Sequence, residues 1–489
     1  MVYIIGTGPG DEDLLTIRAI KAMKKCTAVL YDRLIGGNVL NYLDENCEIY
    51  YCGKEPGCHY KTQEEINKSI IELWGKGHIV GRIKGGDPYV FGRGSEEALE
   101  LLQRHIPFEV VPGITSPIGV LNYAGIPVTH RGTAQSFHII TGTTSEDSNI
   151  NWGALGKLNG TLIFVMGLKH LKNIVENLRN NGMDENTPCG VIMRGTTSKQ
   201  RKAIGTLKNI SEIVEKKQFQ SPCIIAIGPV VEMSEKLNWY EKLPLYGINV
   251  CITRSKKQSI GIKNKLKDLG AEVTEINSIA FKDTSYNLYP YLKYISDYEY
   301  LIFTSANSVN FFFDYLTRNS IDVRMIKSKI FVIGDGTKGA LNKRGIIENF
   351  KTPLFNEDSL IELFRDGVKS GERVLLPCSN LAKSNIKKCL EKLGLIVDRP
   401  EIYETLCGLG TNKNAFKDVD VVVFTSPSTV NNMIHMVGIE KIKEKKAIAI
   451  GPITYNALEK QGIKAISCSE QSEEAIIETV RKIAEGKHD

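Results

Sequence analysis

The second half of this sequence contains three segments that each occur twice, in the same order. Each segment joins a short apolar run to a helical pattern, and the pairs are 247–273 with 371–397, 300–310 with 420–431, and 330–345 with 447–462. A repeated strand-and-helix unit of this kind predicts two similar α/β lobes. Clefts between such lobes are frequent ligand sites. Short patterns that recur by chance are the alternative, and the shared order of all three pairs argues against them.

The first half alternates apolar strand-like runs with helical patterns, which also predicts an α/β architecture. The expected strands cover residues 28–31, 79–84, 108–111, 138–141, 161–166, 189–193 and 223–227. The stretch LNWYEKLPLYG (237–247) ends this half with aromatic residues, a proline and a glycine. We therefore expect two domains, an N-terminal half over residues 1–244 and a C-terminal half over residues 245–489.

The composition is typical of a soluble globular protein, with 42% hydrophobic and 24% charged residues. The net charge of +6 is mild, and the basic residues are spread along the chain, so we expect no nucleic-acid partner. Acidic small molecules stay open as a class of ligand. No apolar run reaches the ~18 residues of a membrane helix. The start, MVYIIG, lacks the pattern of a signal peptide.

The cysteines indicate a reducing compartment. There are 11, an odd number at irregular spacings, which predicts free thiols and a cytoplasmic location. Cys47, Cys52, Cys58 and His59 lie close together in the sequence but form no C-x-x-C pair. We expect no metal, and a structural zinc site is the weaker alternative.

The chain begins with VYIIGTGPGDEDLLTIRA (2–19), an apolar strand, a glycine loop and a helical pattern. Gly6 and Gly8 match the start of the dinucleotide pattern G-x-G-x-x-G, but Asp11 occupies the third glycine position. A carboxylate there would face a pyrophosphate at a helix N-terminus, which disfavours a dinucleotide. A plain glycine turn stays open as the alternative.

Two further loops carry candidate chemistry. In GRIKGGDPYVFGRGSEE (81–97), Gly85 and Gly86 end a strand without side chains, and Asp87 begins a turn. Backbone carbonyls and a carboxylate suit a cationic or amino-bearing ligand, and Asp11 has the same sign; a simple turn is the alternative. In VPGITSPIGV (111–120), Thr115 or Ser116 is expected either to cap a helix or to donate to a ligand.

Five further segments accompany these loops: YDRL, AGIPVTHR, TGTTS, MGL and SPCIIAIGPVV. With them, the chain from residue 1 to about 240 resembles the tetrapyrrole methylases, and among these the uroporphyrinogen-III C-methyltransferases. The resemblance implies a two-lobed α/β domain that binds S-adenosylmethionine between its lobes and is commonly dimeric. It carries over these cofactor positions: Pro9, Gly85, Gly86, Asp87, Val90, Thr115, Ser116, Met166 and Gly195.

The same resemblance implies catalytic roles, with Asp32 of YDRL as proton acceptor and Lys54 of CGKEPG as proton donor. Methyl transfer mainly requires alignment and exclusion of water, and a base assists because a proton must leave. From the residues alone, Asp32 is equally a turn residue at a strand end. Candidate partners of substrate carboxylates are the arginines Arg33, Arg93, Arg131 and Arg201, for which simple solvation is the alternative.

The C-terminal half resembles uroporphyrinogen-III synthase through ITRS, IFTSANSV, VIGDGT, LLPCSN, IYET, VVFTSPSTV and AIGPITYNAL, taken in order. The resemblance implies one lobe of 247–279 plus 405–489, a second lobe of 280–404 joined to it by two strands, and no cofactor. Tyr403 of IYET matches a tyrosine that assists departure of the substrate hydroxyl; a packed aromatic is the alternative. Candidate carboxylate-binding residues that follow strands and precede helices are Ser305, Ser426 and Thr454, with N-capping as the alternative.

The two resemblances fit one reaction sequence. The implied synthase converts hydroxymethylbilane to uroporphyrinogen III, and the implied methyltransferase converts that product to precorrin-2, towards sirohaem or cobalamin. Two rival functions stay open. One assigns the N-terminal half to a methylase relative that acts on a later corrin, an rRNA base or a protein histidine. The other makes the C-terminal half a non-catalytic sensor of acidic tetrapyrroles.

Overall fold

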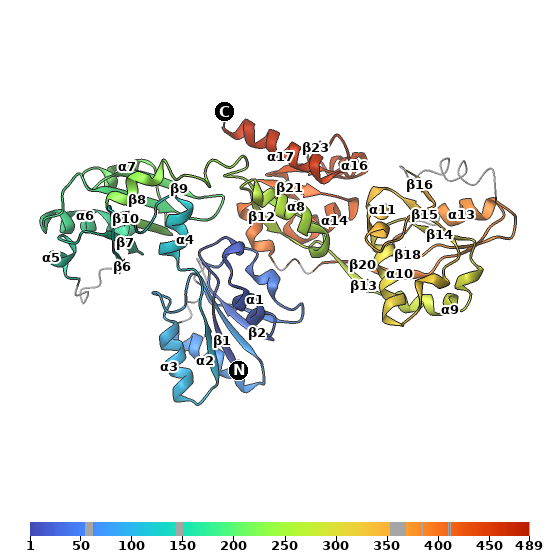
Figure 1. Cartoon of the computed structure of the whole chain (residues 1–489), viewed down its shortest axis with the longest axis horizontal. Coiled ribbons are helices and arrows are strands. Elements are labelled where there is room, and N and C mark those ends of the chain that lie inside the picture. The colour runs from blue at the N-terminus through green and yellow to red at the C-terminus, as the bar shows by residue number, and fades with distance from the viewer. Residues whose placement is uncertain are drawn as a thin grey trace. The chain divides into compact units, whose positions relative to one another are not determined.

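The computed structural model describes residues 1–53, 62–142, 150–352, 368–382, 385–408, 410 and 412–488. Figure 1 shows the whole chain coloured from its N-terminus to its C-terminus. The chain forms two compact units, Met1–Asn277 with Gly410–Asp489, and Ser278–Leu409. The first unit therefore contains the N-terminal half and one lobe of the C-terminal half. Among the described residues, no helix combines the length and the apolar character needed to cross a membrane.

The first sheet is fully parallel. Its strands, in spatial order, are β3 (Glu48–Tyr51), β2 (Ala28–Tyr31), β4 (Val80–Lys84), β1 (Val2–Gly6) and β5 (Phe108–Val111). Helix α1 (Ile17–Met23) covers one face, and α2 (Gln63–Gly75) and α3 (Gly94–Gln103) cover the other, as Figure 1 shows. Because parallel strands present their carboxyl ends at one edge, the loops after β1, β2, β4 and β5 meet there, and ligands of such sheets bind at this edge.

The second sheet of the N-terminal half is mixed. Its order is β6 (Phe137–Thr141), β7 (Thr161–Val165), β10 (Cys223–Ile227), β8 (Pro188–Met193) and β9 (Arg201–Thr206), with only β6 and β7 parallel. Helix α4 (Ser116–Tyr123) packs on one face through Val120 and Leu121. The other face is covered by α6 (Leu171–Asn180) and α7 (Ile210–Lys216), with the short α5 (Trp152–Leu155) at its margin.

The C-terminal half contains two parallel five-stranded sheets of the same strand order. In the first unit the order is β12 (Glu272–Glu275), β11 (Asn249–Ile252), β21 (Val421–Phe424), β22 (Lys446–Ala449) and β23 (Ala465–Ser467). In the second unit it is β19 (Ile396–Asp398), β17 (Arg373–Leu375), β14 (Tyr300–Phe303), β15 (Lys329–Ile333) and β16 (Phe350–Thr352). The repeated segments occupy equivalent strands, which confirms the internal repeat.

Helices follow equivalent strands in the two lobes. In the first unit these are α8 (Lys256–Asp268), α14 (Pro427–Val437), α15 (Ile439–Lys443), α16 (Pro452–Lys460) and α17 (Glu473–His488). In the second unit they are α9 (Tyr289–Leu292), α10 (Ala306–Arg318), α11 (Asp335–Asn342) and α13 (Asn385–Lys392). A small sheet of β13 (Ile279–Asp283), β20 (Glu401–Cys407) and β18 (Cys378–Ser379) lies where the chain enters and leaves the second unit.

Candidate active sites

Three loops lie backbone to backbone at the carboxyl edge of the first sheet. Gly8 and Gly86 form an antiparallel bridge, with N···O distances of 3.2 and 2.7 Å. A Cβ atom on Gly113 would lie 2.2 Å from the carbonyl oxygen of Gly86, and a Cβ on Gly6 would lie 2.7 Å from the Gly113 nitrogen. Side chains at these glycines would therefore collide with the neighbouring loops after β1, β4 and β5. The close contact brings together the candidate cofactor-binding residues that these loops carry.

The Asp87 carboxylate is used inside the protein. Its Oδ1 accepts the N–H of Tyr89 at 2.8 Å, and its Oδ2 accepts the N–H of Gly113 at 3.0 Å. Asp87 thus fixes its own turn and ties the loop after β4 to the loop after β5. The Asp11 carboxylate has a cationic partner within the chain, Lys267 at 2.9 Å. Both carboxylates therefore have partners within the protein, and neither requires a cationic ligand.

Helix α4 gathers further cofactor candidates. Thr115 is its N-cap residue, but its hydroxyl makes no capping hydrogen bond, so capping does not account for this side chain. Pro9 and Gly195 both lie against the helix. A Cβ on Gly119 would be 2.8 Å from Pro9 Cγ, and a Cβ on Gly195 would be 2.3 Å from a Val120 methyl group.

The remaining cofactor candidates differ in exposure. Ser116 is the first residue of α4 and is half-buried, as is Val90 in the turn after β4. Met166 directly follows β7 with 56% of its surface exposed and a positive φ of 56°. A positive φ is unfavourable for a non-glycine residue, and such positions cluster at functional sites.

Asp32 is held by a buried ion network that the sequence analysis missed. Arg82 Nη2 donates to both carboxylate oxygens of Asp32, at 2.8 and 2.7 Å. Arg82 Nε and Lys84 Nζ also lie 3.0 and 2.9 Å from Glu97, whose side chain is fully buried. Arg82 and Lys84 point to one face of a central strand, and two cations at that spacing in a buried strand require an acidic partner. That pattern was available in the sequence.

The proton donor expected from the resemblance, Lys54, lies outside the described residues, as do Cys58 and His59. Cys47 is buried, and burial raises the pKa of its thiol to about 11. Within the part of the chain that the structure describes, no three His, Cys, Asp or Glu side chains gather in a way that suits a metal ion.

The candidate substrate arginines are at the surface. Arg33, Arg93 and Arg131 are all exposed. Arg93 pairs with Glu96 one turn along α3, at 2.7 Å. Arg201 donates to the carbonyl of Lys217 at 2.9 Å. The exposed side chains of Arg33 and Arg131 are accessible to the carboxylates of a substrate.

Tyr403 and Ser305 form a pair in the second unit. Tyr403, on β20, is only 5% exposed, and its hydroxyl lies 3.0 Å from Ser305 Oγ. The ring stacks on Phe311 at 5.1 Å. Burial raises the pKa of the Tyr403 phenol above its ordinary value, so the hydroxyl keeps its proton. Ser305 also caps α10, accepting the N–H of Ser308 at 3.1 Å, so capping and contact with Tyr403 coexist.

The two candidates of the first unit, Ser426 and Thr454, have different surroundings. Ser426 caps α14 in a reciprocal capping box with Thr429. Thr454 lies on α16 and is only 3% exposed, so the structure gives it little surface for a ligand. Sequence spacing alone did not separate these two environments.

Comparisons with known proteins identify both halves. Residues 1–211 match the family model of the tetrapyrrole (corrin/porphyrin) methylases, and residues 261–478 match that of uroporphyrinogen-III synthase HemD. The porphyrin biosynthesis protein HemD of Ruminiclostridium josui is 34% identical over 496 residues, which cover 99% of this chain and 98% of the relative. The chain belongs to this family of fused tetrapyrrole methylases and uroporphyrinogen-III synthases.

Two further similarities concern the N-terminal half. A uroporphyrinogen-III C-methyltransferase of Bacillus subtilis is 46% identical over 242 residues, 49% of this chain and 94% of that protein. A solved uroporphyrin-III C-methyltransferase of Thermus thermophilus, complexed with S-adenosyl homocysteine, is 36% identical with a TM-score of 0.41, covering 47% of this chain and 98% of its own. The fused chain is thus a bifunctional enzyme of tetrapyrrole biosynthesis, with a methyltransferase half and a synthase half.

Proposed function

We propose that the C-terminal half closes hydroxymethylbilane to uroporphyrinogen III with inversion of the last ring, and that the N-terminal half methylates this product twice to precorrin-2. Sirohaem and cobalamin are the end products that such a sequence serves. The observation that carries the proposal is the convergence of the loops after β1, β4 and β5 at one sheet edge, in a chain whose halves match the two families in order.

The residues at this edge suit S-adenosylmethionine, which supplies an electrophilic methyl group on a sulfonium. Gly86 keeps the loops after β1, β4 and β5 in contact at this edge, and the Thr115 hydroxyl is not used for capping. The chain's task is to align the methyl donor with an electron-rich pyrrole carbon and to exclude water. After each transfer the tetrapyrrole must lose a proton, and we assign its acceptance to Asp32. The paired oxygens of Asp32 are fixed by Arg82, so the carboxylate is oriented before substrate arrives.

In the synthase half, we assign Tyr403 to protonate the departing hydroxyl of hydroxymethylbilane. The phenol is suited to this because burial keeps it protonated, and Ser305 orients its hydroxyl at 3.0 Å. The remaining task is conformational, because a flexible polyacid must be held with its ends together. Hydroxyl and backbone groups at the start of α10 suit its carboxylates.

Two variants of the full chain separate the activities. Asp32→Asn should lower methyl transfer by about 10²-fold or more, the usual contribution of a positioned acid or base, and leave cyclisation unchanged. Tyr403→Phe should lower cyclisation by about 10²-fold and leave methylation of added uroporphyrinogen III unchanged. Normal cyclisation by Tyr403→Phe would show that Tyr403 is not the proton donor. Absence of the type III product from the unsubstituted chain, with tetrapyrrole binding retained, would favour the sensor function for the C-terminal half.

The proposal also includes a homodimer formed through the N-terminal half and a cytoplasmic location. Sedimentation of the full chain tests the first, and fractionation of cells that express it tests the second. A monomer at working concentrations would remove the dimer from the proposal without affecting either reaction.

A further inference from the structure

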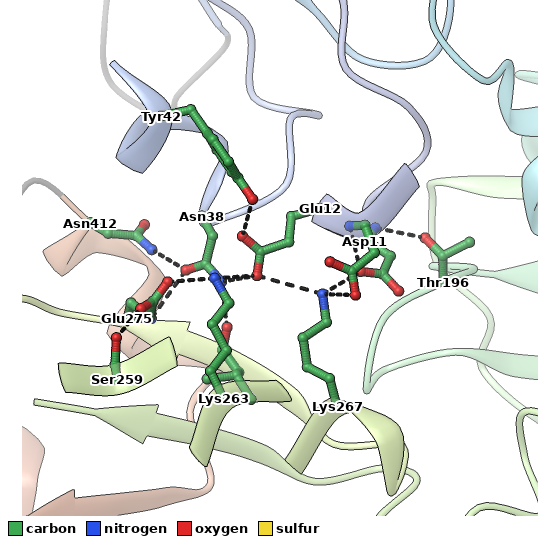
Figure 2. Close-up of polar contacts among 12 residues, drawn as sticks. Asp11, Glu12, Asn38, Tyr42, Thr196, Ser259, Lys263, Lys267, Glu275 and Asn412 are labelled. Atoms are coloured by element: carbon green, nitrogen blue, oxygen red, sulfur yellow. Dashed lines mark hydrogen bonds and ion pairs between the residues drawn. The ribbon is translucent and has the colours of Figure 1, made fainter. Parts of the chain in front are cut away.

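Helix α8 of the C-terminal half contacts the first loop of the N-terminal half through buried charges (Figure 2). Lys267 Nζ lies 2.9 Å from a carboxylate oxygen of Asp11 and 3.6 Å from Glu12. Lys263, one turn earlier, lies 2.9 Å from Glu12. The side chains of Lys267, Lys263 and Glu12 are 12%, 14% and 5% exposed, so salt screens these pairs poorly.

Asp11 connects this contact to the segments that carry the cofactor candidates. Its second carboxylate oxygen accepts the Tyr123 hydroxyl at 3.0 Å, at the end of α4. Its backbone N–H donates to Thr196 Oγ1 at 3.1 Å, as Figure 2 also shows. Asp11 is two residues from Pro9, and Thr196 directly follows Gly195. Asp11 therefore links the first loop to helix α4 through its carboxylate and to the loop after β8 through its backbone N–H.

The C-terminal half holds the loop after β8 by a separate set of contacts. The N–H and hydroxyl of Ser198 both donate to Glu272 of β12, at 2.8 and 2.7 Å. Lys199 Nζ lies 3.5 Å from Asp420, just before β21. Two segments with cofactor candidates are thus anchored on the neighbouring lobe at different points.

We propose that α8 and β12 position the methyl-donor site, with Lys267 acting through Asp11 as a positioning residue. The inference rests on the proposed cofactor site and adds that its affinity in this chain depends on the synthase half. Loops that are fixed before the ligand arrives lose less conformational freedom on binding. Loosening them therefore weakens the binding of substrate and transition state alike, which raises KM and leaves kcat nearly unchanged.

The test uses the full chain with Lys267→Met. We expect KM for S-adenosylmethionine and Kd for S-adenosylhomocysteine to rise by about fivefold or more, the lower end of coupling between sites, and kcat to stay within about twofold. Lys267→Arg keeps the charge and should restore both constants. Lys265→Met is the matched control, because Lys265 lies on the same helix but pairs with Glu473 and Glu474 of its own lobe, at 3.3 and 2.7 Å.

Further variants keep the test decisive. If Lys267→Met folds poorly, Glu272→Gln should also raise Kd for S-adenosylhomocysteine, because it weakens the anchor of Ser198. Unchanged Kd in a folded Lys267→Met or Glu272→Gln chain overturns the inference. Thr115→Val tests the cofactor site itself. If Thr115→Val loses affinity and Lys267→Met does not, only the positioning role is wrong; if neither loses affinity, the proposed site is wrong as well.

Discussion

Glu97 is the carboxylate on which two buried cations of the first sheet depend. Arg82 and Lys84 reach it at 3.0 and 2.9 Å, and its side chain has no exposed surface. Glu97→Gln keeps the size of the side chain and removes its charge, which leaves Lys84 without an acid while Arg82 retains Asp32. An uncompensated buried charge costs about 3–5 kcal/mol. We therefore expect Glu97→Gln to lower the free energy of unfolding of the N-terminal half by about 3 kcal/mol or more.

Urea unfolding followed by tryptophan fluorescence measures this quantity. The chain's 3 tryptophans, Trp74, Trp152 and Trp239, all belong to the N-terminal half, so their emission reports that half alone. Glu109→Gln is the matched control, because Glu109 forms an exposed ion pair with Arg18 at 2.8 Å. The control should change stability by less than about 1 kcal/mol. Equal effects of the two substitutions would refute the reasoning about the buried network.

The pH dependence of the Glu97→Gln deficit identifies the group responsible. Burial and the neighbouring Arg82 lower the pKa of Lys84 below its ordinary 10.5, and Glu97 opposes that shift. A native state with a lowered lysine pKa binds fewer protons than the unfolded state between the two values, so stability rises with pH in that window. Without Glu97 the pKa of Lys84 in the folded state falls further below 10.5, so this pH window becomes wider. The stability that Glu97→Gln loses relative to the unsubstituted chain should therefore shrink as pH approaches 10.5. A deficit independent of pH would show that Lys84 is not the destabilised group.

Three further predictions follow from single contacts. Thr62→Val should cost about 1 kcal/mol of stability because Thr62 caps α2. Thr115→Val should cost less than about 0.5 kcal/mol and should instead raise the Kd for S-adenosylhomocysteine, measured by calorimetry. The reverse pattern would mean that Thr115 is only a cap. Gly113→Ala should lower stability by about 1–3 kcal/mol through collision with the loop after β4, while Gly75→Ala, with nothing within 4 Å, should be neutral or stabilising in the same urea assay. The phenolate absorbance lost in Tyr403→Phe should titrate above the ordinary tyrosine pKa of 10.0 in the wild type, and titration below that value would contradict the buried phenol.

Local sequence patterns predicted most strands of the N-terminal half, including the edge strands β5 and β6, and missed two other edge strands. Strands β2, β5 and β10 have the predicted bounds. β2 and β10 are largely buried apolar runs, and β5 is a half-buried segment that ends in the buried Val111. Strands β3 and β9 were not predicted. Both lie at a sheet edge. Most residues of β3 (EIYY) are exposed, most residues of β9 (RKAIGT) are half-buried, and neither segment has the long apolar run of a buried strand.

The candidate site was predictable only where it depends on short segments. The glycine loops and the helix start at Thr115 are local patterns, and parallel strands bring them to one edge. The partners of charged groups were not predictable in the same way. Asp11 was interpreted as facing a cationic ligand, whereas its cation is Lys267, 256 residues further along the chain. Such pairings depend on how surfaces fit together, which no local pattern encodes.

The central claim, two successive reactions in one chain, is tested most directly by giving the purified full-length protein fresh hydroxymethylbilane with and without S-adenosylmethionine. Products are identified by mass and by isomer analysis. The account predicts the type III isomer of uroporphyrinogen without the methyl donor, and a product heavier by two methyl groups with it. The spontaneous type I isomer alone, under both conditions, would contradict the synthase assignment, and type III isomer without methylation would contradict the methyltransferase assignment.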